Sequence, residues 1–177
     1  MRAFLLIGLA LAVLASAPAS AQALKGHNAN APVEFSADRI EVQDRADSVV
    51  ASGNVKVTQG GLSLDSARLT IAYTGAIAGG NPTIQRLDAS GGVTVRSASE
   101  TARGNFAIYD LNRRLITMIG GVTLNQGANT VRGGRLVIDL NSGRSVIDGA
   151  AVGRGPGVSG GSGGRVTGRF SVPQRTN

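Results

Sequence analysis

Apolar and polar residues alternate along nearly the whole chain after residue 31. Clear examples are Val55-Lys56-Val57 and Leu69-Thr70-Ile71, in which every second side chain is apolar. Such segments are short and bounded by Gly, Asn, Asp or Ser. Because successive side chains of a strand point to opposite faces, this pattern predicts half-buried antiparallel strands. Apolar residues spaced by three and four positions are missing beyond the N-terminal region, so we expect an all-β fold without a long helix.

Turn-forming residues separate the alternating segments. Asn112-Arg113, Gln126-Gly127 and Asn141-Ser142-Gly143 each lie between two of them. Asn and Gly tolerate the positive φ angles that tight hairpins require. The stretch from Thr74 to Pro82, with three Gly and one Pro, predicts a longer loop.

The alternation also contains an internal repeat. Gly53-Asn54-Val55-Lys56-Val57 matches Gly91-Gly92-Val93-Thr94-Val95 and Gly120-Gly121-Val122-Thr123-Leu124. A second apolar pair follows each copy at a similar distance: Leu69-x-Ile71, Phe106-x-Ile108 and Leu136-x-Ile138. The copies are too long and too unevenly spaced for a hexapeptide β-helix. They predict one rolled sheet of consecutive hairpins.

The chain divides into four regions by composition. Residues 1–21 have the basic start, apolar run and Ala19-Ser20-Ala21 box of a secretory signal peptide cleaved after Ala21; an uncleaved anchor is the alternative. Residues 22–31 form a flexible N-terminal segment, residues 32–148 the β-domain, and residues 149–177 a Gly/Arg-rich flexible tail. Within the tail, the alternation from Val166 to Val172 leaves a last strand open, although a disordered tail is favoured.

The charge is concentrated in the tail. The whole chain has 18 Lys+Arg against 11 Asp+Glu, but residues 149–177 hold four Arg and no acid. A basic tail can be attracted to phosphates or to an acidic partner, or it can simply be solvated. With no Cys and one His, the chain has little material for a metal or thiol site, and we expect neither cofactor nor metal.

The polar residues do not form a recognisable active site. His27 precedes the first strand, where a solvated side chain is favoured over a ligand or a base. Asp38, Glu41, Asp44 and Asp47 are close in sequence, but turn-forming and solvating roles are favoured over cation binding. Without a Ser-His-Asp arrangement or an acid pair, the sequence does not predict an enzyme.

Four arginines are candidates for contact with phosphate groups. A guanidinium can bind a phosphate through two hydrogen bonds. Surface solubility is the favoured role of these side chains, which are Arg113, Arg114, Arg132 and Arg135.

Part of the chain is similar to a known family. Residues 32–40 read Pro-Val-Glu-Phe-Ser-Ala-Asp-Arg-Ile, residues 51–60 read Ala-Ser-Gly-Asn-Val-Lys-Val-Thr-Gln-Gly, and residues 64–71 read Leu-Asp-Ser-Ala-Arg-Leu-Thr-Ile. This ordered set resembles the OstA-like family, most closely the LptA-type periplasmic proteins that carry lipopolysaccharide to the outer membrane. The chain departs from the family at Ser66-Ala67-Arg68, where Ala-Asp-Lys is common, and in its tail, which has no counterpart.

The resemblance implies a fold and a lipid-binding face. The fold is a single-domain, twisted, open β-jelly roll whose apolar inside shelters lipid A acyl chains. The inward residues would be Val33, Phe35, Val55, Val57, Leu69, Ile71, Val93, Val95, Phe106, Ile108, Leu136 and Ile138. Taken one by one, ordinary core packing is the favoured role of these residues. The register of the second unit stays open, since Tyr109 could replace Ile108 as the inward residue.

The implied function is transport without catalysis. Such a protein would bridge the periplasm, assemble head to tail, and meet OstA-like domains of inner-membrane and outer-membrane lipopolysaccharide-transport proteins. The alternative is a structural or adhesive exported β-protein with a filled core and no ligand. Nucleic-acid binding ranks last, because an aromatic content of 3% leaves few side chains for base stacking.

Overall fold

The structure, a computed structural model, describes residues 27–75, 82–149 and 165–170, which form ten strands of a single sheet. One 3-10 turn, Asp44–Ala46, is the only helical element in these ranges, and no helix among them is long and apolar enough to span a membrane. The strands are β1 Glu34–Ser36, β2 Arg39–Gln43, β3 Ser48–Gln59, β4 Leu62–Thr74, β5 Thr83–Arg96, β6 Glu100–Asp110, β7 Leu115–Gln126, β8 Asn129–Asp139, β9 Arg144–Asp148 and β10 Thr167–Arg169.

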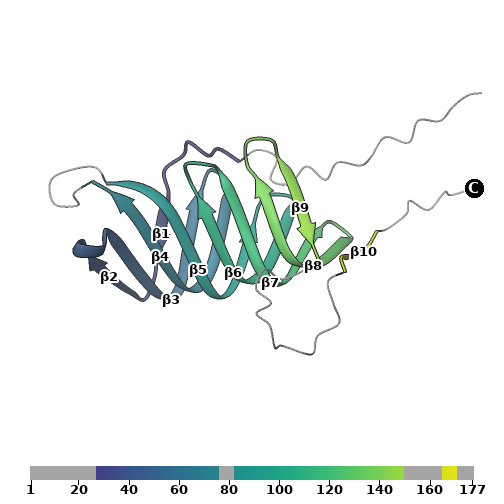
Figure 1. Ribbon diagram of the computed structural model, residues 1–177, viewed down its shortest axis with the longest axis horizontal. Helices are drawn as coiled ribbons and strands as arrows, with labels where there is room; N and C mark the ends of the chain where they lie inside the picture. Colours follow the sequence, from purple (N-terminus) through teal and green to yellow (C-terminus); the bar gives the residue numbers. More distant parts are fainter. Residues whose placement is uncertain (1–26, 76–81, 150–164, 171–177) are drawn as a thin grey trace, which may run out of the picture.

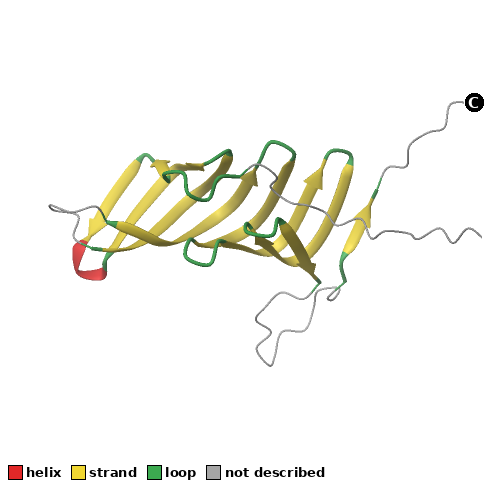
Figure 2. Ribbon diagram, turned by 90° about the horizontal axis from the view of Figure 1, so that it is seen from above, coloured by secondary structure: helices red, strands yellow, loops and turns green. Residues whose placement is uncertain are grey.

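The sheet is an antiparallel meander with divided edges (Figure 1). Strands β3 to β8 pair in sequence order, each with its neighbour. At one end β1 and β2 pair with the two halves of β3; at the other end β10 and β9 pair with the two halves of β8. Figure 2 shows the 3-10 turn at one end of the sheet and β10 at the other. Each edge therefore consists of two short strands.

A line of register shifts bends every long strand. The shifts lie between Ser52 and Val55 in β3 and recur in each following pair up to β7 and β8. Bulges of this kind bend a strand and increase its twist. Because they lie side by side, the sheet folds over along this line into two layers.

The first layer contains β1, β10 and the halves of β3 to β8 next to the β3–β4, β5–β6 and β7–β8 turns. The second layer contains β2, β9 and the other halves of β3 to β8. Buried residues of both layers form one hydrophobic core, in which Val55 and Val57 represent the first layer and Leu69 and Ile71 the second. This is the open jelly roll that the family resemblance implies.

The bulges explain the Gly repeat. Gly53, Gly91 and Gly120 all have positive φ angles and stand at the shifts of β3, β5 and β7. At Gly91, φ is +84°, and a Cβ atom would lie 2.6 Å from the Cβ of Ala67 on the neighbouring strand. Neither the backbone angle nor the space allows a side chain. The repeat therefore marks the bends of the sheet as well as its strands.

The predicted fold class and turns are confirmed. The chain reverses at residues 111–114, 127–128 and 140–143, and the three repeat units are the β3–β4, β5–β6 and β7–β8 hairpins. The strand left open in the tail is β10, which pairs with β8 at residues 130–132. The predicted signal peptide, most of the predicted loop (76–81) and most of the tail (150–164 and 171–177) lie outside the described residues.

Candidate functional site

The inner face of the roll holds ten of the twelve residues that the sequence places there. Val33 and Phe35 are half-buried and pack against the core. The other eight are buried in it: Val55, Val57, Leu69, Ile71, Val93, Val95, Leu136 and Ile138. They form rows that run across both layers from one end of the sheet to the other. Contact of these side chains with lipid stays a prediction.

Phe106 and Ile108 do not belong to the inner face, and their predicted inward orientation is wrong. Phe106 is 53% exposed and Ile108 half-buried, whereas Ala107 and Tyr109 are in the core. The alternation along β6 changes phase at its bulge, so that Ala102 points inward before the bulge and Ala107 after it. Tyr109 is therefore the inward residue of this pair. Counting every second residue along β6 therefore gives the wrong face for the side chains beyond the bulge.

The apolar inner face is uncovered at the β2 end. Ile40 and Val42 pair in register with the buried Ala51 and Val49, so they continue the inner rows. Unlike those neighbours, Ile40 is 50% and Val42 51% exposed. β2 is the last strand of the second layer, and in the described residues no strand follows it. An apolar face that ends in half-exposed aliphatic side chains is suited to contact another apolar group.

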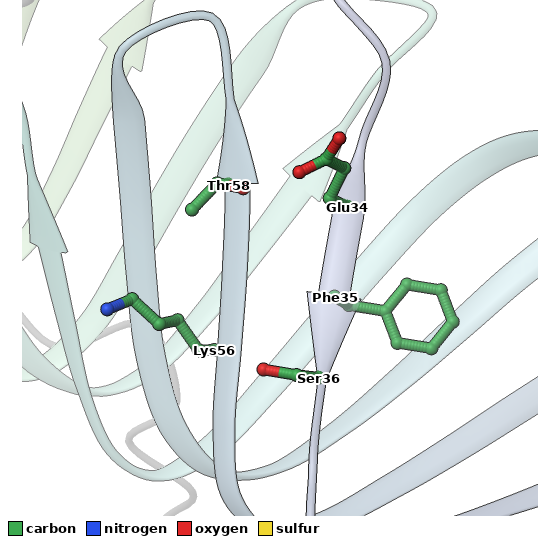
Figure 3. A pocket seen from close by; sticks show the side chains of 5 residues that line it. All are labelled: Glu34, Phe35, Ser36, Lys56 and Thr58. Carbon is green, nitrogen blue, oxygen red and sulfur yellow. The ribbon is translucent and has the colours of Figure 1, made fainter.

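The β1 end has the same character. Figure 3 shows Phe35 on the opposite side of β1 from Ser36, Lys56 and Thr58, which face outward. Phe35 pairs in register with Val57 of the core and is itself only partly covered. The outward side chains line a shallow hollow of about 200 Å³ beside the free edge of β1. β1 thus offers an apolar inner side and a polar outer side.

A strap of residues 27–33 runs along the rim of the roll before β1 (purple in Figure 1). Asn28 N donates to Gly60 O at 3.1 Å. On the far side, Arg114 donates from Nη2 to Asn30 Oδ1 at 2.8 Å and from Nη1 to Asn141 Oδ1 at 3.3 Å. The strap therefore connects the β3–β4 turn of the first layer with the β6–β7 and β8–β9 turns of the second. Residues 27–31, which the sequence analysis assigns to a flexible segment, make these contacts along the rim.

A buried hydrogen-bond chain fixes the strap from inside. Tyr109 Oη donates to Gln59 Oε1 at 2.8 Å, and Gln59 Nε2 donates to the carbonyls of Ala29 at 3.1 Å and Ala31 at 3.0 Å. Gln59 and Tyr109 are both buried. Burial raises the pKa of the Tyr109 phenol, so its hydroxyl remains a donor at neutral pH. The sequence analysis did not predict these hydrogen bonds. A polar residue at the end of an apolar strand pattern looks the same in the sequence whether its side chain is buried and bonded or exposed to solvent.

His27 is partly buried at the start of the strap, which corrects the expectation of a solvated side chain. Both ring nitrogens are inaccessible and have no hydrogen-bond partner in the described part of the chain. Burial lowers the pKa of His27 because the charged imidazolium loses its hydration; the backbone of Gln59 and Gly60 acts in the opposite direction. The neutral ring is therefore the form that fits this position.

Several of the other polar candidates have structural contacts. Asp38 accepts a hydrogen bond from Asn54 Nδ2 at 2.8 Å, beside the β3 bulge. Arg114 holds the strap, and Arg135 forms an ion pair with Asp148 at 3.5 Å. Arg113 and Arg132 are exposed. No group of three His, Cys, Asp or Glu that could bind a metal ion occurs among the described residues.

Phe106 and its neighbours form an outer apolar hollow on the solvent side of the second layer. Its volume is about 440 Å³, and the residues that line it include Phe106, Ile108 and Ile119 together with Arg68 and Asp88. It lies on the opposite face of the sheet from the core.

Comparison with known proteins identifies the fold and the family. The family model described as "LptA/(LptD N-terminal domain) LPS transport protein" matches residues 34–144. The chain belongs to this family. The match begins at β1 and ends at the first residue of β9. It therefore covers β1 to β8, and leaves out the strap, most of β9 and the whole of β10.

Two individual proteins are similar to this chain. A protein of Rhizobium meliloti (strain 1021), described as uncharacterized protein R00383, is 32% identical over 114 residues, which are 62% of this chain and 61% of that protein. The crystal structure of LptH, the LptA homologous periplasmic component of the lipopolysaccharide transport device of Pseudomonas aeruginosa, has a similar fold. Its TM-score is 0.63 with 18% identity, over 80% of this chain and 96% of LptH. The OstA-like, LptA-type resemblance of the sequence is thereby confirmed.

Proposed function

We propose that this chain binds the acyl chains of lipopolysaccharide on its inner face and carries the lipid across the periplasm from the inner to the outer membrane. The observation that supports this most is the half-exposed pair Ile40 and Val42, which continues the apolar rows of the core to an open end. Each methylene group that leaves water for such a surface contributes about 0.8 kcal/mol. Membership of a lipopolysaccharide-transport family makes lipid A acyl chains the natural occupants.

The route into the interior would be the rim. Side chains of the two layers pack closely against one another, with Leu69, Met118 and Leu136 fully buried. An acyl chain can lie between the two layers only where the layers separate. The bends join the layers along one side, so they can separate only along the opposite side, which is the rim. The strap and the Gln59–Tyr109 bond close that side. We therefore place lipid loading at the open end formed by β1 and β2 and along the rim beneath the strap.

Head-to-tail assembly would make the inner face continuous over several copies. From β2 to β9 there are eight strands in antiparallel order, so β2 and β9 run in opposite directions. A second copy that continues the sheet would therefore place its β2 antiparallel to β9 of the first. Both edges are free to accept a neighbour in the described part of the chain, and unpaired strand edges favour such addition.

Location and partners follow from this role. Export through the N-terminal signal peptide predicted for residues 1–21 would bring the chain to the periplasm. Lipopolysaccharide-transport proteins of the inner and outer membrane with OstA-like domains would add to the two ends of an assembly in the same way. No covalent bond is made or broken in this process, so the energy for transport comes from elsewhere.

A photo-crosslinking experiment tests the lipid site. A benzophenone amino acid is introduced at Phe35 or at Ile40, both on the inner side, and at Phe106, on the outer side, as the matched control. We expect lipopolysaccharide to be captured at the first two positions in cells and in a delipidated preparation incubated with the lipid. Equal capture at Phe106, or none at Phe35 and Ile40, would contradict the proposal.

The close packing of the core favours one other candidate, a structural β-protein that binds no ligand. In that case the two layers stay together and Ile40 and Val42 are covered only by another protein chain. The same experiment separates the candidates, because crosslinks at Ile40 would then contain protein and never lipid.

A further inference from the structure

The solvent side of the first layer is polar at every position of two register rows that cross the whole layer. One row runs from Ser36 on β1 to Thr167 on β10, and the other runs from Glu34 to Arg169. Besides charged residues, the two rows contain only Ser, Thr and Asn. Figure 3 shows one of these side chains, Lys56, facing outward. We call the surface formed by the two rows the polar face.

The polar face has an excess of positive charge, with five cations and two carboxylates. The cations are Lys56, Arg96, Arg103, Arg132 and Arg169, and the carboxylates are Glu34 and Asp65. Asp65 is ion-paired with Arg96. The other four cations are exposed, and none of them forms an ion pair with a described residue. Their positive charge is therefore free to attract an anionic partner.

The solvent side of the second layer differs in both respects. Its three register rows, which end on β9 at Asp148, Val146 and Arg144, carry five cations and five carboxylates. Three of these cations are ion-paired with a carboxylate of the same side. The rows also include the apolar residues of the hollow around Phe106. The free positive charge of the folded roll is thus concentrated on the first layer.

The composition of the polar face indicates which kind of anion it suits. A stable protein interface has an apolar and aromatic centre, and a groove for single-stranded nucleic acid has aromatic side chains for base stacking. The two rows contain neither. A bilayer surface of anionic phospholipids requires neither, because Lys and Arg are attracted to it across water and hydroxyl groups can donate to phosphate oxygens. The eight strands of the layer extend over on the order of 30 Å, so the face can meet several headgroups at once.

A hollow of about 430 Å³ opens on the polar face beside Lys56. Its walls include Asn54, Thr94 and Asp65, of which Asp65 is already paired with Arg96. A headgroup phosphate that enters this hollow would lie between the Lys56 ammonium group and neutral hydrogen-bond donors. Both the free charge and the shape of the face therefore suit a layer of phosphate groups.

We propose that the polar face docks on the anionic phospholipid headgroups of a membrane, with Lys56, Arg103, Arg132 and Arg169 as the attracting charges. The second layer then faces away from the bilayer. Docking of this kind needs neither the inner face nor the free edges of the sheet. It is therefore independent of the lipid carriage and of the assembly proposed above.

Binding to vesicles of defined composition tests the docking. The exported chain without residues 1–21 is used, because the apolar run of the predicted signal peptide can itself bind a bilayer. We expect the chain to co-sediment with vesicles made of equal amounts of phosphatidylglycerol and phosphatidylcholine, and not with vesicles of phosphatidylcholine alone. Binding should decrease as salt is added, because salt screens exposed charges.

Removal of charge from one side or the other tests which side docks. Each Lys or Arg close to an anionic bilayer strengthens binding about fivefold, so Lys56→Gln combined with Arg132→Gln should weaken it roughly twenty-five-fold. Arg68→Gln combined with Arg144→Gln is the matched control, since it removes the same net charge from exposed positions of the second layer. The control should change binding by at most about twofold, because its side chains are screened from the bilayer. Thermal melting shows whether each variant remains folded.

A fluorescent label on either side of β7 reports the orientation. The chain has no Cys, so Thr123→Cys and Thr117→Cys each introduce a single thiol for labelling. Thr123 lies on the polar face between Arg103 and Arg132, whereas Thr117 lies on the solvent side of the second layer beside Ile108. Lipids with a nitroxide on the headgroup should quench the label at position 123 and leave the label at position 117 bright.

Several outcomes would overturn the docking: no binding to anionic vesicles, equal binding to neutral ones, an equal loss in the two double variants, or equal quenching of the two labels. A chain that binds soluble poly-glutamate through Lys56 and Arg132 but does not bind vesicles would also overturn it, and would assign the polar face to an acidic protein. Capture of lipopolysaccharide at Ile40 is measured separately. Either proposal can therefore fail while the other stands.

Discussion

Tyr109 Oη donates a hydrogen bond to Gln59 Oε1 at 2.8 Å, and this bond connects the two layers of the roll at its rim. The two residues are separated by 50 positions and come from β6 and β3. Since Gln59 Nε2 also binds Ala29 O and Ala31 O, the same amide group holds the strap. Closure of the rim therefore depends on a short chain of buried polar contacts.

Removing the hydroxyl should weaken the protein measurably. Tyr109→Phe leaves Gln59 Oε1 buried without its partner, which costs about 1–3 kcal/mol of unfolding free energy. Urea denaturation of the two proteins measures the difference. Gln59→Leu should cost more in the wild-type background than in the Tyr109→Phe background, because the second variant has already lost the shared bond. Equal costs in the two backgrounds would show that the bond contributes nothing.

Acidification should loosen the strap through His27. Burial lowers its pKa in the folded state, so below the ordinary value of 6.5 the unfolded chain binds more protons than the folded one. Stability contributed by the neutral ring is therefore present above pH 6.5 and decreases as the pH falls toward the lowered pKa. Hydrogen exchange of the amides of Asn28 and Ala31 should accelerate between pH 7.5 and pH 5.5, after correction for the intrinsic exchange rate.

His27→Gln is the control for that experiment, because glutamine does not titrate. Its corrected exchange rates should be the same at both pH values. A pH response of equal size in this variant would place the titrating group elsewhere.

Two adjacent glycines allow the bend of the sheet to be tested. Gly91 and Gly92 have similar positive φ angles, +84° and +83°, but only at Gly91 would a Cβ meet a neighbour, at 2.6 Å from Ala67 Cβ. Both Ala variants should lose about 1–2 kcal/mol from backbone strain. Gly91→Ala should lose additional stability from the contact, measured by urea denaturation. Ala67→Gly removes the Cβ atom that causes this contact. In the Ala67→Gly background, Gly91→Ala should therefore lose only the stability that corresponds to backbone strain.

A polar substitution at the open end should reduce lipid capture without unfolding the protein. Ile40→Asn makes the half-exposed inner side of β2 polar, while Glu41→Asn changes the same strand on its outer side. Because both positions are exposed, unfolding free energies should stay within about 0.5 kcal/mol of wild type. Capture of lipopolysaccharide by the Phe35 crosslinker should fall for Ile40→Asn alone. The same yield for both variants would argue against lipid contact at this end.

Local alternation was enough to predict the strands and hairpins, because an antiparallel meander is built from neighbouring segments. It was not enough to predict, for every strand, which side chains point toward the core. The bulge in β6 reverses the phase between Ala102 and Ala107, and the reversal moves Phe106 and Ile108 to the outer face. The sequence marks the position with Gly104-Asn105, but the same residue types also occur in turns that reverse the chain.

The strap along the rim was not predicted from the sequence, for a different reason. Residues 27–33 have neither helical nor strand periodicity, and the position of the strap is determined by contacts with Arg114 and Gln59, which are distant in sequence. His27 is partly buried beside the backbone of Gln59 and Gly60, which are also distant in sequence. Conversely, Ile40 and Val42 have the alternation of an ordinary core strand, and only the sheet order shows that they are last in their row.

The antiparallel order of the strands also limits how such a protein can change in length during evolution. Adding or deleting one whole hairpin, such as β5–β6, keeps the number of strands even and leaves the direction of both end strands as it was. Adding a single strand would reverse one end, and copies arranged head to tail would then meet through parallel edge strands, which pair less stably. Each hairpin of this fold also has its own bend, so a duplicated hairpin extends both layers together. Lengthening by pairs of strands is therefore the simple path to a longer roll.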